Sequence, residues 1–432
     1  MLANVNKKTQ PSNEYRYQKT VRYLKTRIVK KVTGLSTFIN AKKWNICREL
    51  KWKCLPLQNE SIKGPMEPIK TMKKTILLTM LLLLAILPIA AQENLEPSSE
   101  QHHLEDENKV GFVLGLHNFS FFDNREVKSP YQKSQTLFGA HVGAEVGVQL
   151  GANHIMAGAL GVKNFGESGW VKETFTFYYY YEEGHFSGAL GLFPRERLKT
   201  ELPNIFLYDS LRYYSPTLNG ALIQYTGRNG FAELYCNWLN KQGAYEREIF
   251  EIVTKGQFGS KGFYGGWNAQ LMHYSVPENS EGIYVYDKIM LHPYAGFQTS
   301  KLKWLDALTV NAGAVLSLNR ERQDREWKTP LGFMGDVKLR KWRFELSDHL
   351  YWGEKQFSDY QRHGNQLFRG DPYYRSKLYN RTDLTFYLLN KSYVQCRVTA
   401  SVHYTEQKID NSQQIILHLF PDKDLLGKLF KR

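Results

Sequence analysis

The chain has 432 residues, of which 14% are aromatic and 23% charged, and a formal net charge of +15 from 57 Lys/Arg and 42 Asp/Glu. Residues 1–91 hold 18 of the basic and 4 of the acidic residues, so the remainder carries 39 basic and 38 acidic side chains. A segment this close to neutrality lacks the basic bias of nucleic-acid-binding proteins. We therefore expect no nucleic-acid partner.

A secretory signal peptide is predicted at residues 72–91. Met72-Lys73-Lys74 is a short basic start, Thr75–Ile89 is almost wholly apolar, and Ala90-Ala91 supplies small residues for cleavage. Because signal peptides begin at the initiator methionine, we interpret residues 1–71 as a mis-annotated basic extension. The alternative is a genuine cytoplasmic segment followed by a membrane anchor. Residues 92–109 are polar and acidic, and are predicted to form a flexible tail.

The next segments alternate between apolar and polar residues. From Phe138 to Leu150 every second residue is apolar, and small or polar residues stand between them. Successive side chains of a strand point to opposite faces, so this pattern indicates a strand with one apolar and one polar face. The pattern recurs up to Phe420 in segments of about ten residues, the length that crosses a bilayer as a tilted strand.

These segments number about 16, within a range of about 14 to 18. The first is predicted at Val110–Phe122 and the last at Gln413–Phe420. Connections after even-numbered segments tend to be short, as at Gly151-Ala152, whereas Pro194–Thr217 and Gly353–Leu378 follow odd-numbered ones. Short periplasmic turns and longer extracellular loops are typical of outer-membrane barrels. The sequence thus predicts an all-β, antiparallel transmembrane β-barrel over residues 110–420, with a short C-terminal tail at 421–432.

With this architecture the chain resembles the porin-like outer-membrane barrels of Gram-negative bacteria. The resemblance implies an outer-membrane location after signal-peptide cleavage and passage of small hydrophilic solutes. It also implies outer-membrane lipid and the barrel-assembly machinery as partners. We see no signal for a particular oligomeric state.

The polar faces of the predicted strands carry charged residues. We expect them to line a wet interior, where they either filter solutes or form ion pairs that only stabilise the barrel. These candidate pore-lining residues are Glu145, Glu233, Asp336, Lys338, Glu345, Arg381, Asp383, Arg397, His141 and His403.

The two long loops mix Arg, Asp and Tyr, which suits a constriction inside the pore or a ligand-binding surface. Ordinary surface variation is the alternative. The candidate loop residues are Arg195, Arg197, Asp209, Arg212, Arg362, Arg369, Asp371, Tyr373 and Arg375.

No catalytic, cofactor or metal motif stands out, so we expect a channel rather than an enzyme. Two alternatives remain open. One is a secreted, soluble all-β glycan-binding protein. The other is an outer-membrane enzyme, for which His141, His403 or His363 with Ser401 or Asp371 could supply a catalytic pair.

Overall fold

The computed structural model describes residues 110–280, 284–300, 302–324 and 326–419. The predicted signal peptide, the basic segment before it, the acidic tail and the segment 421–432 lie outside these residues. The described residues form a closed barrel of sixteen antiparallel strands, in which each strand pairs with its neighbours in sequence and the first pairs with the last. The prediction of an all-β, porin-like antiparallel barrel is confirmed.

The strands are β1 (Val110–Glu126), β2 (Gln135–Leu150), β3 (Asn153–Asn164), β4 (Lys172–Glu183), β5 (Phe186–Pro194), β6 (Thr217–Gly227), β7 (Gly230–Asn240), β8 (Ile249–Ser260), β9 (Phe263–Tyr274), β10 (Tyr286–Thr299), β11 (Ala307–Glu321), β12 (Leu331–Lys341), β13 (Phe344–Gly353), β14 (Leu378–Asn390), β15 (Val394–Thr405) and β16 (Ile409–Leu419). The helical segments are η1 (Arg195–Arg197), α3 (Asp209–Tyr214), α4 (Tyr360–Leu367) and η2 (Pro372–Arg375). No helix among the described residues is long and apolar enough to cross a membrane.

The alternation of the sequence separates two faces of the sheet. The outer face is apolar and exposed: Phe112 on β1 is 90% and Phe175 on β4 is 80% accessible. The inner face carries polar residues such as Glu145, which is 2% exposed although its sequence neighbour Val146 is 63% exposed. Apolar side chains turned outward all around a closed sheet are typical of a barrel surrounded by lipid.

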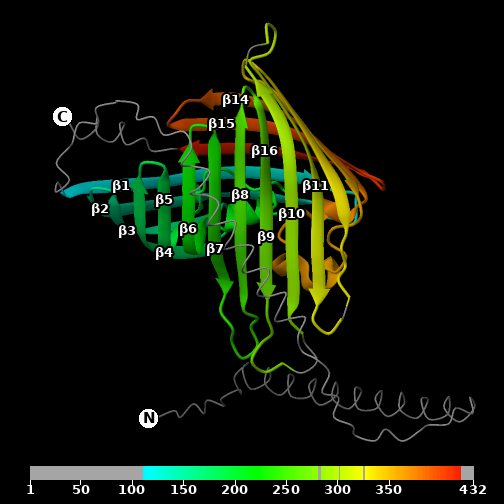
Figure 1. The fold of residues 1–432 in the computed structure, drawn as a ribbon, viewed down its shortest axis with the longest axis horizontal. Helices are drawn as coiled ribbons and strands as arrows, with labels where there is room; N and C mark the ends of the chain where they lie inside the picture. Colours follow the sequence, from blue (N-terminus) through cyan, green and yellow to red (C-terminus); the bar gives the residue numbers. More distant parts are fainter. Residues whose placement is uncertain (1–109, 281–283, 301, 325, 420–432) are drawn as a thin grey trace, which may run out of the picture. The chain divides into compact units, whose positions relative to one another are not determined.

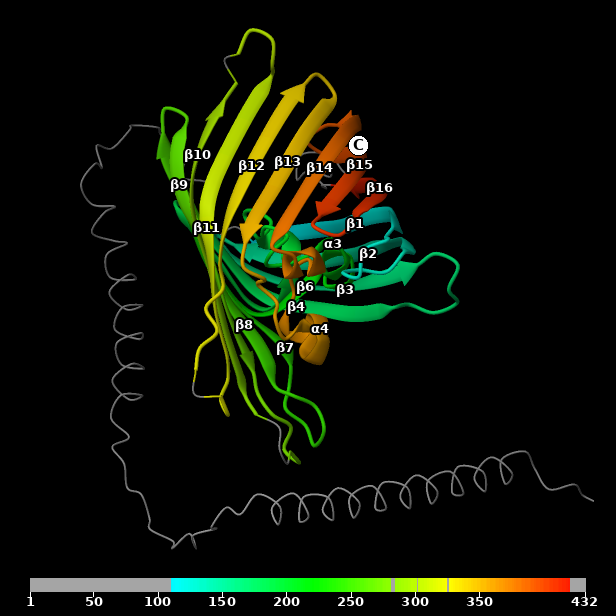
Figure 2. The same ribbon diagram turned by 90° about the vertical axis from the view of Figure 1, so that its right-hand side faces the viewer.

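The strands on different sides of the barrel cross steeply. In Figure 1, β6 to β11 run up the picture, whereas β14 to β16 and β1 to β3 run across it. Twisted, tilted strands produce such crossing when a sheet closes on itself. Figure 2 shows the same barrel from the side, with α3 and α4 on the concave side of the sheet.

The two long loops fold into the barrel and fill much of its interior. The loop between β5 and β6 buries Ile205 and Phe206, and the loop between β13 and β14 buries Phe357 and Phe368, all at most 1% exposed. These side chains belong to one apolar cluster with inward residues of the barrel wall. An apolar core inside the barrel fixes the loops and leaves only limited room for water.

The predicted bounds of the first and last strands are wrong where they matter for the site. The first strand continues from Phe122 to Glu126, and the last begins at Ile409 rather than Gln413. Both extensions consist mostly of polar residues, which continue the backbone ladder between β1 and β16 without continuing the apolar pattern. The extra residues turn out to belong to the candidate site.

Candidate functional site

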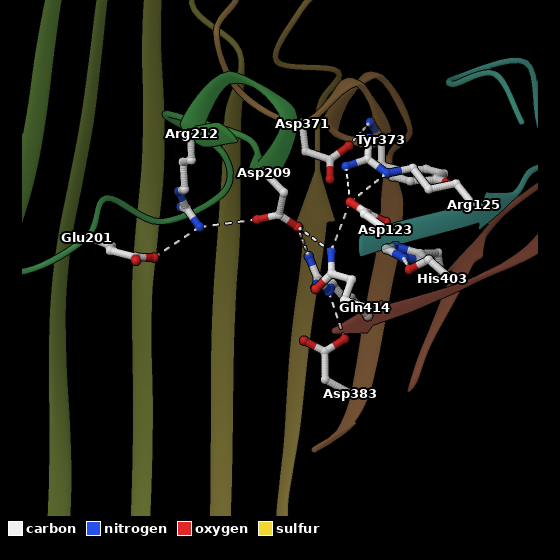
Figure 3. Close-up of polar contacts among 12 residues, drawn as sticks. Asp123, Arg125, Glu201, Asp209, Arg212, Asp371, Tyr373, Asp383, His403 and Gln414 are labelled. Carbon is white, nitrogen blue, oxygen red and sulfur yellow. Dashed lines mark hydrogen bonds and ion pairs between the residues drawn. The ribbon is translucent and has the colours of Figure 1, made fainter. Parts of the chain in front are cut away.

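A cluster of polar side chains lies on the inner wall where β14, β15, β16 and β1 meet α3 and η2. Figure 3 shows its side chains pointing toward one another from these elements. The cluster forms because the polar residues of each alternating strand face inward, and because α3 places its first residue, Asp209, against the wall. The site therefore depends on both the barrel closure and the folded-in loops.

A chain of alternating charges crosses the site. The Arg381 guanidinium donates from Nε to Asp383 Oδ1 at 2.8 Å and from Nη1 to Asp209 Oδ2 at 3.1 Å. Asp209 Oδ1 also accepts from Arg212 Nη1 at 3.2 Å. Charge-assisted bonds of this kind are strong and directional, so α3 is held against β14.

A second ion pair lies on β1, next to the first. Arg125 donates from Nε to Asp123 Oδ2 at 3.1 Å, and the two side chains are 7% and 0% exposed. The Gln414 amide on β16 links the carboxylates of Asp123 and Asp209. Its Nε2 lies 3.2 Å from Asp123 Oδ2 and 3.4 Å from Asp209 Oδ2. The two ion pairs thus form one network.

A histidine and a serine approach each other beside this network. His403 Nε2 lies 3.2 Å from Ser412 Oγ, and its Nδ1 lies 2.9 Å from the Tyr379 hydroxyl. The Tyr373 ring of η2 stacks on the imidazole at 4.9 Å between centroids. Stacking and two hydrogen bonds fix the orientation of His403, as a base that must face a hydroxyl requires.

Two cavities adjoin the network, and we call them the upper pocket and the lower chamber. The upper pocket, of about 10 Å³, is lined by Arg125, Val127, Gln132, Tyr208, Asp209, Asp371, Tyr373, His403, Asn411, Ser412 and Gln414. The lower chamber, of about 180 Å³, is lined by Asn204, Asp209, Arg212, Lys338, Glu345, Ser347, His349, Arg381, Asp383, Thr385, Tyr387, Arg397, Thr399 and Gln414. The upper pocket holds about one water molecule, and the lower chamber has room for a small polar ligand.

The two loop carboxyl groups of the site have opposite electrostatic character. Burial raises the pKa of Asp371 from 3.8 to about 6, although the Tyr373 backbone N–H donates to it. Burial also opposes ionisation of Asp209, but the guanidinium groups of Arg381 and Arg212 outweigh it and hold the pKa of Asp209 well below its usual range. Asp209 is therefore a fixed negative charge, and Asp371 titrates near neutrality.

Six of the predicted residues meet within this network. They are Arg381, Asp383, His403, Asp209, Arg212 and Tyr373, and Asp371 adjoins them through Gln132 Nε2 at 2.7 Å. Lys338, Glu345 and Arg397 line the lower chamber. The structure therefore brings ten of the nineteen candidates to the network and the two cavities beside it.

The other predicted residues make contacts outside this network, either between neighbouring strands or with the long loops. Glu145 bonds His117, Glu233 bonds Lys255, His141 bonds the Tyr213 carbonyl, and Asp336 bonds His349. Arg195 bonds the Ser215 carbonyl, Arg197 bonds Tyr178, Arg362 pairs with Glu321, Arg369 lies 3.7 Å from Glu251, and Arg375 bonds the Tyr131 carbonyl. These contacts are those of a stabilised interior.

The structure does not form the histidine pairs considered from the sequence. His403 meets Ser412 rather than Ser401, and His363 packs between the rings of Tyr274 and Tyr286. Ser412, Asp123 and Arg125 were missed because they lie beyond the predicted ends of the last and first strands. The available signal was the alternation of the strands, which places these three side chains on the inner face when it is continued past the predicted ends. In the described part of the chain, no group of three or more His, Cys, Asp or Glu side chains is arranged to hold a metal ion.

Solved structures with a similar course of the chain are bacterial outer-membrane proteins. The anion-selective porin from Comamonas acidovorans has a TM-score of 0.46 and 10% identity, over 72% of this chain and 100% of the porin. A loop-deletion mutant of OmpT, an outer membrane protein of Vibrio cholerae, has a TM-score of 0.45 and 7% identity, over 72% and 99%. At these scores the likeness adds no argument about function. No curated protein sequence matches the chain.

The family comparison is more extensive. A profile of the lipid A 3'-O-deacylase-type family matches residues 104–428, which include the whole barrel. A deacylase is an enzyme, so the expectation that the chain is not an enzyme is wrong. No known catalytic motif stands out in the sequence, which is why the sequence pattern did not reveal an enzyme. The chain belongs to the lipid A 3'-O-deacylase-type family.

Proposed function

We propose that this protein is an outer-membrane hydrolase that cleaves an acyl ester of a lipid A-type glycolipid. The observation that carries the proposal is the oriented Ser412–His403 pair in the upper pocket, taken together with the family. The exposed apolar outer face supports placement in a membrane and disfavours the soluble glycan-binding alternative. Outer-membrane lipid and the barrel-assembly machinery remain the expected partners.

In the proposed reaction His403 acts as the general base. In this reaction the Nδ1–H of His403 donates a hydrogen bond to the Tyr379 oxygen, so Nε2 of His403 is unprotonated. Nε2 then accepts the proton of the Ser412 hydroxyl. The serine oxygen then attacks the ester carbonyl, and the imidazolium returns the proton to the leaving alkoxide, which leaves an acyl-serine. In a second step His403 takes a proton from a water molecule, which attacks the acyl-serine carbonyl and releases the fatty acid and the free serine. The products are a shortened lipid and a fatty acid.

Arg125 supplies the positive charge that this reaction needs. It stands directly opposite Ser412 in the register of β1 and β16, which places the two Cβ atoms about 5 Å apart. In the proposed reaction the Arg125 guanidinium stabilises the negative charge that develops on the carbonyl oxygen of an ester attacked by Ser412. The ion pair with Asp123 holds the guanidinium in position. The upper pocket has room for about one water, which is the size of the water molecule that the reaction consumes.

Lipid mass spectrometry tests the proposal. The full chain is expressed in a Gram-negative host that retains all acyl chains of its lipid A, and the folded barrel is verified by heat-modifiable gel migration. We expect the wild type to remove one acyl chain and S412A and H403Q to leave the lipid intact. S401A is the matched control, because Ser401 faces Ser412 in the β15–β16 register. A folded wild type that leaves every acyl chain in place, or an active S412A, overturns the proposal.

Passage of small hydrophilic solutes is a second candidate function. The lower chamber supports it, because it is lined by polar residues and solvent reaches it beside Lys338, whose side chain is 51% exposed. The apolar core of the two loops opposes free diffusion through the rest of the lumen. Ion conductance in planar bilayers tests this function separately from lipid cleavage.

A further inference from the structure

The lower chamber is a polar cavity on the inner wall of the barrel. Side chains of β12 to β16 form most of its lining, and Asn204, Asp209 and Arg212 from the loop between β5 and β6 complete it. Asp209 and Gln414, in contact at 3.4 Å (Figure 3), mark the end of the chamber that adjoins the upper pocket. At about 180 Å³, the chamber has room for a small polar solute.

The chamber lies toward the short turns of the barrel. Lys338 stands near the end of β12 and Arg397 near the start of β15, next to the connections of residues 342–343 and 391–393. The Lys338 side chain is 51% exposed, so solvent reaches the chamber there. Short turns of outer-membrane barrels face the periplasm. A solute therefore reaches the chamber from the periplasmic side.

The chamber carries more positive than negative charge. Four cationic side chains line it, and the three carboxylates of Asp209, Glu345 and Asp383 oppose them. Arg397 has no carboxylate partner among the described residues, and its Nη1 donates to the neutral Gln395 amide oxygen at 3.2 Å. A guanidinium has five N–H donors in a fork that matches an oxyanion, so Arg397 has donors left for an anion from solution.

Hydroxyl groups stand beside Arg397 on the same face of the sheet. Thr399 is the next inward residue of β15, and Thr385 lies directly opposite Thr399 in the register of β14 and β15. Such neighbouring positions are about 5 to 7 Å apart. The two threonine hydroxyls share one hydrogen bond at 2.9 Å, and both residues are 6% exposed. Because only one of the two hydroxyls donates in that bond, the other hydroxyl proton is available to a ligand.

The same cavity also offers acceptors for hydroxyl groups. Glu345 lies 3.6 Å from Lys338 and accepts from the Tyr387 hydroxyl at 3.3 Å, and Asp383 Oδ1 accepts from Arg381 at 2.8 Å. An ionised carboxylate has about four acceptor positions, so both can accept further bonds. The chamber thus combines a cationic part with a part that accepts hydrogen bonds.

We propose that the lower chamber binds a small hydroxylated solute that carries an oxyanion group, a carboxylate or a phosphate. Arg397 and Thr399 bind the oxyanion, and Glu345 and Asp383 accept from the hydroxyl groups of the solute. The proposal goes beyond ester cleavage and does not depend on it, because the chamber binds the solute whether or not Ser412 is active.

Isothermal titration calorimetry of the purified, detergent-folded full chain tests the site with D-gluconate, inorganic phosphate and the neutral sugar D-glucose. We expect gluconate to bind, phosphate to compete with it and glucose not to bind. R397Q should weaken gluconate binding by about tenfold or more, because it removes a charge-assisted hydrogen bond, and T399V by about two- to tenfold. R340Q is the matched control, because it removes the same charge from a side chain that lies over the Tyr387 ring at 4.9 Å and does not line the chamber.

Heat-modifiable migration verifies the fold of each variant, and T399V carries the test if R397Q does not fold. A folded wild type that binds neither gluconate nor phosphate overturns the site. Equal binding of glucose and gluconate overturns the oxyanion, and binding of phosphate alone overturns the hydroxylated solute. The position at Arg397 is overturned if R397Q and T399V bind like the wild type, or if R340Q weakens binding as much as R397Q. A failure to cleave lipid, measured separately, concerns only the proposed hydrolase.

Discussion

The substitution D371N should stabilise the barrel at neutral pH. Asp371 is 4% exposed, and its Oδ1 accepts from the Gln132 amide at 2.7 Å and from the Tyr373 backbone N–H at 3.2 Å. An asparagine Oδ1 can accept both bonds without carrying a charge into the interior. The change therefore removes the cost of burying a carboxylate and keeps its contacts.

The magnitude follows from the pKa of Asp371. Burial raises this pKa from an ordinary value of 3.8 to about 6. The folded state then binds more protons than the unfolded state between these values, so stability falls as the pH rises through them and the full cost is present above pH 6. At about 1.4 kcal/mol per pH unit, the cost at pH 7.5 is about 3 kcal/mol, and it shrinks to about 1 kcal/mol at pH 4.5.

Urea unfolding in lipid vesicles, followed by tryptophan fluorescence at pH 4.5 and 7.5, measures this difference. We expect D371N to exceed the wild type in free energy of unfolding at pH 7.5 and to lose most of its advantage at pH 4.5. The matched variant D209N should behave in the opposite sense, because the depressed pKa of Asp209 means that its carboxylate stabilises the fold at neutral pH. The reasoning is refuted if D371N is destabilised at pH 7.5, or if its gain does not depend on pH.

Two further predictions concern the lumen and the outer face. F206A should lower the free energy of unfolding by about 3 to 5 kcal/mol, because Phe206 is fully buried inside the barrel and its loss leaves a cavity; a shift below about 1 kcal/mol in urea unfolding would show that the loop core is loosely packed. Cys236 and Cys396 are free and half-buried on the outward face, so a charged thiol reagent should label them in urea but not in folded protein in vesicles. Rapid labelling in intact vesicles would contradict the placement of this face in lipid.

The fold was predictable because one physical pattern repeats along the chain. In Val394–Thr405 the outward residues Val398 and Val402 alternate with inward Thr399 and His403, and the same period of two fixes which face each side chain occupies. Strand number follows from counting such segments. The parity that placed Arg381 and His403 inside the barrel is the same signal, so these residues of the site could be named in advance.

The contents of the lumen could not be predicted with the same rule. Ile205 and Phe206 lie in a connection, and Phe357 and Phe368 lie in another, where no period relates apolar residues to a direction. Apolar residues in a long loop indicate burial somewhere, but the partner surface is the inner wall formed by strands from the whole chain. Only the closed barrel supplies that surface.

The candidate catalytic residues come together only when the barrel closes. Arg125 and Ser412 are separated by nearly the whole barrel sequence, and they become neighbours because β1 and β16 pair in one particular register. A slip of that register by one residue would turn one of the two side chains to the outer face. Neither strand end is apolar enough to specify the register alone, so the bonds of Gln414 to Asp123 and Asp209 help to fix it. The same contacts thus align the seam of the barrel and hold the charge beside Ser412, which is why both stability and the proposed chemistry should respond to changes at this point.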